Sequence, residues 1–170
     1  ASGVTILPLR QKLVSFSTPT FPTQVWLLAR AESDAQPIVP SGDIETDIAA
    51  VKKIMKDRQV LCKPGTCLDP NLYQLDKTGT QVKLFDGGLN ELAPAVILRE
   101  AEMTILDVPD ALVAIDKWHG KLKIIGPVSL EQQMAFAFPK DATALRESFN
   151  QFFKQCCEDG SGPTAGWRAT

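Results

Sequence analysis

The 170-residue sequence lacks the features of several large functional classes. It has a single histidine, His119, which excludes mechanisms that need two histidines and also a histidine-rich metal site. No apolar run reaches the ~18 residues needed to span a bilayer. The P-loop, G-x-S-x-G, G-x-G-x-x-G and H-E-x-x-H motifs are missing. We therefore expect no enzyme activity, no cofactor, no metal and no direct membrane insertion, and we interpret His119 as an exposed turn residue.

The charge balance excludes another class. Eighteen Lys and Arg residues stand against 20 Asp and Glu residues, which gives a net charge of -2. Nucleic-acid binding needs clustered positive charge, so we expect no nucleic-acid partner. The start of the chain, at residues 1–6, has no signal-peptide pattern and is typical of the interior of a domain.

The sequence does contain enough apolar residues, 44%, for one domain or for two small lobes. Residues 8–14 form about one helical turn or a loop, and the tail 158–170 is expected to be mobile. From residue 59 to 125 strands and helices alternate, which predicts βαβ units and a largely parallel sheet with helices on both faces. The predicted strands are 5–7, 23–30, 59–62, 81–85, 102–106, 122–125 and 133–138, and the predicted helices are 43–56, 70–79, 90–99, 109–117 and 142–154.

Three groups of polar residues follow strand ends, where open α/β sheets bind ligands. Arg10 follows the first strand and suits a carboxylate, but its position by itself is more typical of a solvated surface arginine. The turn at 65–67 leads toward a helix start, which either seats an anion or is only a capped end. Asp107 either meets a ligand ammonium or caps the helix that begins near Pro109. Together the three groups suit a zwitterion.

The four cysteines leave alternatives open. Cys62 and Cys67 are separated by a Lys-Pro-Gly-Thr turn, which brings two Cα atoms within disulfide range if the chain reverses there. They are otherwise two unrelated thiols. Cys156 and Cys157 are adjacent, and because a bridge between neighbours is strained we expect both to be thiols.

Five segments, in order, resemble the polar-amino-acid family of periplasmic solute-binding proteins. They are residues 2–19, 63–67, 103–107, 124–141 and 145–150, and together they cover nearly the whole chain up to about residue 160. Ser15 and Thr20 depart from the Asp and Tyr that are usual in the family.

The resemblance implies a ligand site for an amino acid or a similar small zwitterion. The arginine at the Arg10 position clamps the ligand carboxylate, which also meets the backbone N–H at the Cys67 position. The Cys67 amide lies at the end of the family's turn, here Gly65-Thr66-Cys67.

The resemblance also assigns the partners of the ligand ammonium. The hydroxyl at the Thr5 position and the backbone carbonyl at the Gly3 position receive it, and the aspartate at the Asp107 position pairs with it. The setting outside the cytoplasm would let a Cys62–Cys67 disulfide form, and we predict that bridge.

The implied fold is a periplasmic-binding-protein-like α/β fold, with one complete βαβ lobe and remnants of a second lobe joined by hinge strands. Lobe two spans 24–131. Lobe one comprises 1–23, which ends in the first hinge crossing, and 132–170, and it lacks the family's N-terminal βαβα portion.

The implied function is solute binding in ABC-type uptake or sensing, in the periplasm or outside the cell, with an amino acid as ligand and a membrane permease as a further partner. The alternatives are a cyclohexadienyl-dehydratase-like enzyme, for which Asp86, Asp107 and Asp110 are the nearby carboxyl groups, and a sensory domain from a kinase or a cell-wall lytic enzyme.

Overall fold

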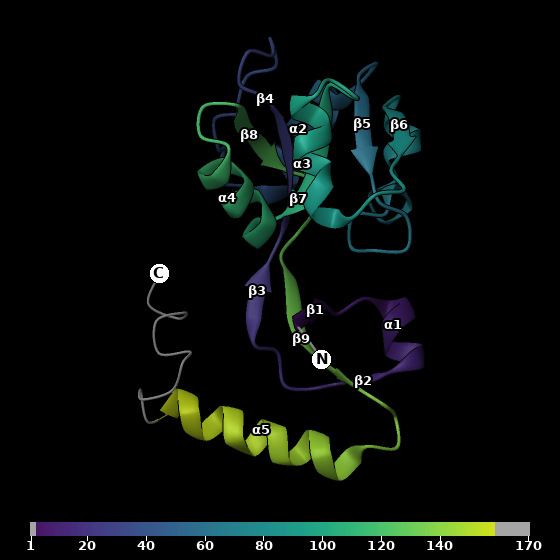
Figure 1. Ribbon diagram of the computed structural model, residues 1–170, viewed down its shortest axis with the longest axis vertical. Coiled ribbons are helices and arrows are strands. Elements are labelled where there is room, and N and C mark those ends of the chain that lie inside the picture. Colours follow the sequence, from purple (N-terminus) through teal and green to yellow (C-terminus); the bar gives the residue numbers. More distant parts are fainter. Residues whose placement is uncertain (1–2, 159–170) are drawn as a thin grey trace. The chain divides into compact units, whose positions relative to one another are not determined.

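The computed structural model describes residues 3–158, so most of the tail predicted to be mobile lies outside the described residues. The chain divides into two compact units. Unit 1 comprises residues 1–23 and 132–170, and unit 2 comprises residues 24–131. Figure 1 shows the elements of both units.

Unit 2 is built on a five-stranded sheet with the strand order β6-β5-β7-β4-β8. All five residues of β7 are buried, so both faces of the sheet are covered. The strands are β4 (Val25–Arg30), β5 (Gln59–Cys62), β6 (Gln81–Leu84), β7 (Met103–Asp107) and β8 (Leu122–Pro127).

The prediction of a largely parallel sheet is correct for the direction of β5, β6, β7 and β8, and β4 is the exception. β5 pairs in parallel with β6 and with β7. β4, however, inserts between β7 and β8 and is antiparallel to both. Its residues Leu27, Leu28 and Ala29 are fully buried, as suits a strand with a neighbour on each side.

Three of the helical elements of unit 2 begin at aspartate side-chain caps. Asp43 accepts a hydrogen bond from the Thr46 amide at 3.0 Å and starts α2. The predicted helix 70–79 is wrong, because Gln74 adopts a left-handed backbone conformation and divides it into two 3-10 turns. The helical elements are α2 (Ile44–Met55), η1 (Pro70–Tyr73), η2 (Leu75–Thr78), η3 (Leu89–Glu91), α3 (Leu92–Ile97) and α4 (Val108–Lys117).

Unit 1 is organised around one long strand, β9 (Gln132–Phe138), which pairs antiparallel with three short ones. Phe136 and Phe138 of β9 pack against Phe149 of α5. The other elements are β1 (Gly3–Thr5), α1 (Pro8–Leu13), β2 (Ser15–Phe16), β3 (Phe21–Thr23) and α5 (Thr143–Glu158).

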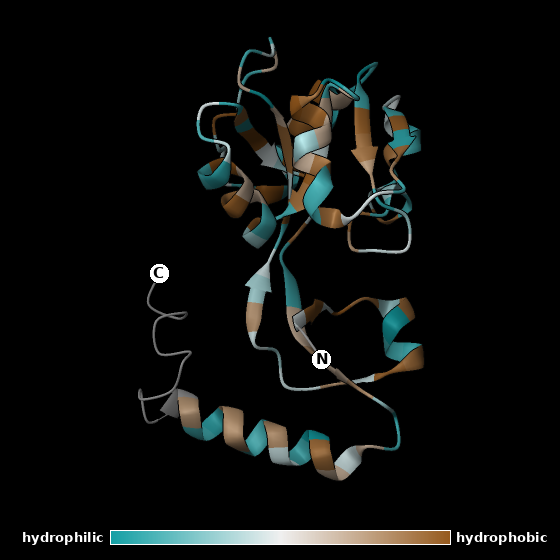
Figure 2. Ribbon diagram, viewed as in Figure 1, coloured by the Kyte–Doolittle hydropathy of each residue, from teal (hydrophilic) through white to brown (hydrophobic). Residues whose placement is uncertain are grey.

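The main hydrophobic core lies in unit 2. Every buried residue of this cluster falls between Val25 and Val128. In Figure 2 the ribbon of β5 is largely brown, whereas α5 alternates between brown and teal as an amphipathic helix does. The large core makes unit 2 a rigid base for the residues at the carboxyl ends of β5 and β7.

Candidate functional site

The candidate residues of unit 1 lie close together. Arg10 Nη1 donates a hydrogen bond to the backbone carbonyl of Thr5 at 3.0 Å, because Pro8 starts α1 directly after β1. Thr5 is 2% exposed, and Gly3 pairs with Phe136 on the same strand ladder. Arg10 makes no ion pair with any described residue. Its guanidinium is therefore held in place by one hydrogen bond and keeps donors for an acidic group.

In unit 2 the turn after β5 was predicted to bind an anion, but several of its donors bond to side chains and carbonyls of the turn itself. The Gly65 amide donates to the carboxylate of Asp69 at 2.9 Å, and the same carboxylate accepts from the Asn71 amide at 3.0 Å. Thr66 Oγ1 donates to Lys63 O and accepts from the Leu68 amide. The side chain of Asp69 thus fills the position in which we expected a ligand carboxylate to meet the Gly65 amide.

The pKa of Asp69 is consistent with this arrangement. Burial by itself would raise the pKa of this carboxyl group, but the hydrogen bonds from the amides of Gly65 and Asn71 lower it below its ordinary value. Asp69 therefore carries its negative charge inside the turn. Because the Gly65 amide is already bonded to that charge, it is not the contact for a ligand carboxylate, and the Cys67 amide stays the contact that the family resemblance implies.

Asp107 ends β7 and caps α4, as the capping alternative predicted. Its carboxylate accepts from the Asp110 amide at 3.4 Å, and the residue is 8% exposed. Burial, and to a lesser degree the nearby charge of Asp110, raise the pKa of Asp107 to about 6. None of the ion pairs in the described part of the chain involves Asp107. A buried carboxylate without a cation favours the binding of a positively charged group.

The turn and Asp107 belong to the same edge of the sheet. β5 and β7 are parallel neighbours, with Leu61 opposite Thr104, so their carboxyl ends point the same way. The two other carboxyl groups considered for an enzyme, Asp86 and Asp110, are exposed. Lys63 Nζ donates to the backbone carbonyl of Asp86 at 2.9 Å, which ties the end of β6 to this edge.

The structure contradicts the predicted disulfide. Cys62 and Cys67 are both buried thiols, and no bond joins them. Cys62 lies within β5, where its thiol contacts the carbonyl of Val60. Burial raises the pKa of the Cys62 thiol to about 12, with a further contribution from the charge of Asp69. Cys156 is also a thiol, and the side chain of Cys157 lies outside the described part of the structure.

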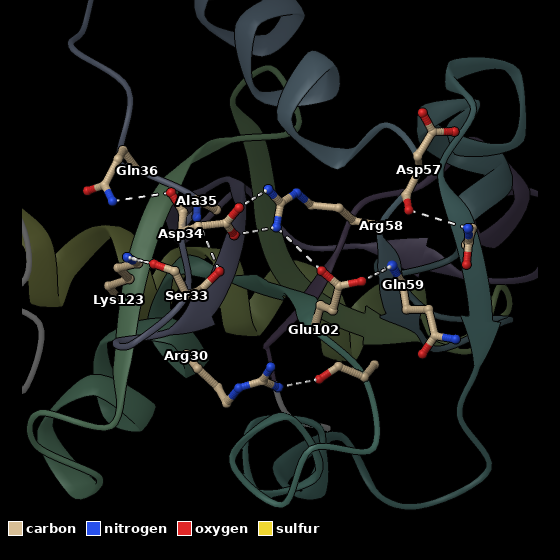
Figure 3. Close-up of polar contacts among 12 residues, drawn as sticks. Arg30, Ser33, Asp34, Ala35, Gln36, Asp57, Arg58, Gln59, Glu102 and Lys123 are labelled. Carbon is tan, nitrogen blue, oxygen red and sulfur yellow. Dashed lines mark hydrogen bonds and ion pairs between the residues drawn. The ribbon is translucent and has the colours of Figure 1, made fainter.

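A group of charged contacts lies at the other end of the unit 2 sheet (Figure 3). Arg58, just before β5, pairs with Asp34 at 2.7 Å and with Glu102 at 3.4 Å. The hydrogen bonds from Arg58 lower the pKa of Asp34 to about 2. Arg58 thus joins the loop that carries Asp34 to the residue just before β7, and these ion pairs hold the two segments together. The sequence analysis singled out none of them, because the partners are far apart in the chain.

Two further properties concern the whole described region. Within residues 3–158, no three His, Cys, Asp or Glu side chains are grouped to hold a metal ion. No helix in that range has the length and apolar character to cross a membrane.

The chain is similar to proteins that bind small solutes and to a cell-wall enzyme. It is 24% identical over 164 residues to the membrane-bound lytic murein transglycosylase F of Desulfosudis oleivorans, and the match covers 95% of this chain but 33% of the transglycosylase. A mutant of ArgBP from T. maritima shares 25% identity with a TM-score of 0.76, over 94% of this chain and 62% of that protein. The chain therefore spans less than two thirds of the length of both.

Two more structures show the same fold at lower identity. An ancestral arginine-binding protein bound to arginine has a TM-score of 0.75 at 20% identity, covering 93% of this chain and 65% of its own. A histidine kinase sensor domain with similarity to periplasmic binding proteins has a TM-score of 0.70 at 13% identity, and the match covers 93% of this chain and 63% of the sensor domain. Residues 1–162 match the model of the bacterial extracellular solute-binding proteins, family 3, and the chain belongs to that family.

Proposed function

We propose that this chain is the amino-acid-binding part of an extracytoplasmic solute-binding protein, and that it binds its solute without transforming it. Arg10 receives the solute carboxylate, together with the backbone N–H of Cys67. Asp107 pairs with the solute ammonium, with Thr5 and the carbonyl of Gly3 as further acceptors. The turn residues Gly65 and Thr66 shape this site. These roles follow the resemblance of the sequence to the family.

The main observation behind the proposal is that the carboxylate of Asp107 is buried without a cation among the described residues. Its carboxylate is 8% exposed and has no cation among its described neighbours. A helix cap alone does not need an aspartate at this depth, because Ser, Thr or Asn caps a helix without burying a charge. A solute ammonium would supply the missing positive charge and restore the ordinary acidity of the group.

The division of the candidate residues between the two units supports binding by closure. Gly3, Thr5 and Arg10 belong to unit 1, whereas the turn and Asp107 belong to unit 2. A zwitterion held by both units favours the arrangement in which its two ends are satisfied together. In uptake, a membrane permease would recognise that arrangement.

Titration calorimetry with a panel of amino acids tests the proposal. The panel includes L-arginine and L-glutamine, which are named with structurally similar proteins. We expect Arg10→Ala and Asp107→Ala each to weaken binding about tenfold to a hundredfold, the range of a charge-assisted contact. Lys77→Ala, an exposed charge in η2, is the control and should change the affinity less than twofold.

Asp107→Asn separates ligand binding from capping, because asparagine caps a helix nearly as well as aspartate. It should lose affinity as Asp107→Ala does while keeping α4 intact by circular dichroism. Equal affinity in the wild type and in both site variants would contradict the proposed roles of Arg10 and Asp107. If the wild type bound no amino acid of the panel, the proposed ligand class would be wrong.

A sensory role is the second candidate, and two similarities favour it. One relative is a cell-wall lytic enzyme of which this chain covers a third, and one structure of the same fold is a kinase sensor domain. Titration with soluble murein peptides distinguishes this candidate from amino-acid uptake. Tighter binding of the peptides than of any free amino acid would favour sensing of cell-wall fragments.

A further inference from the structure

Two backbone connections join the units, at Thr23–Gln24 and at Glu131–Gln132. Beside them β3 and β9 pair antiparallel, with Thr23 directly opposite Gln132, and the two strands run next to each other in Figure 1. Any movement of one unit against the other has to change the backbone near these two points.

On the unit 2 side the two connecting segments are fastened to each other. Ser129 Oγ accepts from the Val25 amide at 2.9 Å, and the Gln24 side chain donates to the Ser129 carbonyl at 2.9 Å. The Trp26 indole N–H donates to the Gln24 side chain at 2.7 Å. These bonds tie residues 24–26 to 129 as part of unit 2, whereas the pairing of Thr23 with Gln132 is the last tie between the two segments on the unit 1 side.

Thr23 lies on that side and carries a buried polar atom without a partner. The residue is 3% exposed, and its Oγ1 makes no hydrogen bond to any residue in the range 3–158. Thr20, three residues earlier in the same crossing, donates its hydroxyl to the Met134 carbonyl at 3.2 Å. A buried hydroxyl without a partner is unfavourable, because it has lost its bonds to water and gained none. The arrangement shown is therefore penalised at Thr23.

Thr23 is also connected to the candidate site through β9. Thr5 pairs with Met134 on one edge of β9, and Thr23 pairs with Gln132 on the other. Because residues two apart on a strand share a face, Thr5 and Thr23 lie on the same face of this small sheet. A shift of β9 that changes the surroundings of Thr23 would also move the strand that holds Thr5.

We propose that Thr23 is a positioning residue of the hinge: its hydroxyl is unsatisfied in this arrangement of β3 and β9 and gains a hydrogen bond when the crossing strands shift. Thr23 thereby biases the equilibrium between the arrangements of the two units. Its effect on ligand affinity rests on the proposed function, whereas its effect on the crossing strands does not.

Hydrogen exchange of the ligand-free protein tests the proposal without any ligand. Thr23→Val replaces the hydroxyl by a methyl group of similar shape and removes the penalty, so peptides that cover β3 and β9 should exchange about 5- to 150-fold more slowly. Thr23→Ser keeps the hydroxyl and should exchange within about twofold of the wild type. Thr20→Val, the matched control, loses a made hydrogen bond and should exchange faster.

The direction of the change in exchange rate decides whether the Thr23 hydroxyl lacks a partner. If Thr23→Val exchanged faster, as Thr20→Val should, or failed to fold, the Thr23 hydroxyl would have a partner in the folded protein and the proposal would be overturned. Unchanged exchange in Thr23→Val would overturn it as well.

Titration with L-arginine then addresses the coupling to binding. If L-arginine binds, Thr23→Val should change its dissociation constant at least threefold, because a hinge bias alters the fraction of binding-competent protein. Thr23→Ser keeps the hydroxyl and should have the dissociation constant of the wild type. An unchanged constant would contradict the coupling. If no amino acid bound even the wild type, the proposed function would fail, and the exchange of the ligand-free variants would still decide the role of Thr23.

Discussion

Replacement of Asp107 by asparagine should raise the free energy of unfolding of the ligand-free protein and weaken the binding of the ligand. The carboxylate is buried, and its pKa lies at about 6 where the ordinary value is 3.8. A shift of this size corresponds to about 3 kcal/mol of destabilisation when the group is charged. Asparagine removes the charge and keeps the cap on the Asp110 amide. The variant therefore isolates the cost of the buried charge.

The pH dependence gives the sign of the effect. Because the pKa is higher in the folded state, the folded protein binds more protons than the unfolded chain between about pH 4 and about pH 6. The wild type therefore loses stability at this site as the pH rises through that window. The loss is complete above about pH 6, and Asp107→Asn does not suffer it.

Urea unfolding at several pH values measures this difference. The free energy of unfolding of Asp107→Asn should exceed that of the wild type by up to about 3 kcal/mol at pH 7.5, and by about zero near pH 3.5. Asp116→Asn, an exposed aspartate on the same helix, is the control and should stay within about 0.5 kcal/mol at both pH values.

Two results would refute the reasoning. If Asp107→Asn were less stable than the wild type at pH 7.5, the carboxylate would have a favourable partner that the structure does not show. If the stability gain were the same at every pH, it would not come from the charge. If Asp107→Asn were more stable but bound an amino acid as tightly as the wild type, the buried charge would be confirmed as destabilising, and Asp107 would not belong to the binding site.

Two further predictions concern other residues. Iodoacetamide at pH 8 should label Cys62 only after unfolding, because the thiol is fully buried and burial raises its pKa to about 12. If the unreduced protein had a mass lower by two hydrogen atoms than the reduced protein, Cys62 and Cys67 would instead form a disulfide. Gly126→Ala should lower the free energy of unfolding by about 1–3 kcal/mol in a urea titration, since the added Cβ would lie 2.7 Å from Val51 Cγ2 and 2.8 Å from Ile38 Cγ1. An unchanged midpoint would show that β8 moves aside without cost.

Features that depend on neighbours in the chain were predictable. The start of α2 at Asp43 and the cap of α4 at Asp107 follow from short-range signals, because a capping side chain reaches only the next few amides. The alternation of strands and helices predicted the parallel pairs of β5, and the order of five short segments predicted the family.

Features that depend on distant neighbours were not predictable. The position of β4 between β7 and β8 is one, because an apolar strand can be buried at many places in a sheet. The occupation of the Gly65 amide by Asp69 is another, since only the folded turn brings this helix-capping carboxylate back to an amide four residues earlier. The partners of Arg58 are a third, as they come from loops that only the folded sheet brings together.

The sequence by itself determined the family, the α/β class and which polar residues follow strand ends, because these depend on local patterns of residue type. Only the tertiary structure decided the condition of those residues. It placed the Arg10 guanidinium on the Thr5 carbonyl, and among the described residues it gave the buried Asp107 no cation and the Thr23 hydroxyl no partner. Burial and pairing depend on which distant segments pack together, and free energies of the order of a few kcal/mol at such sites arise from that packing.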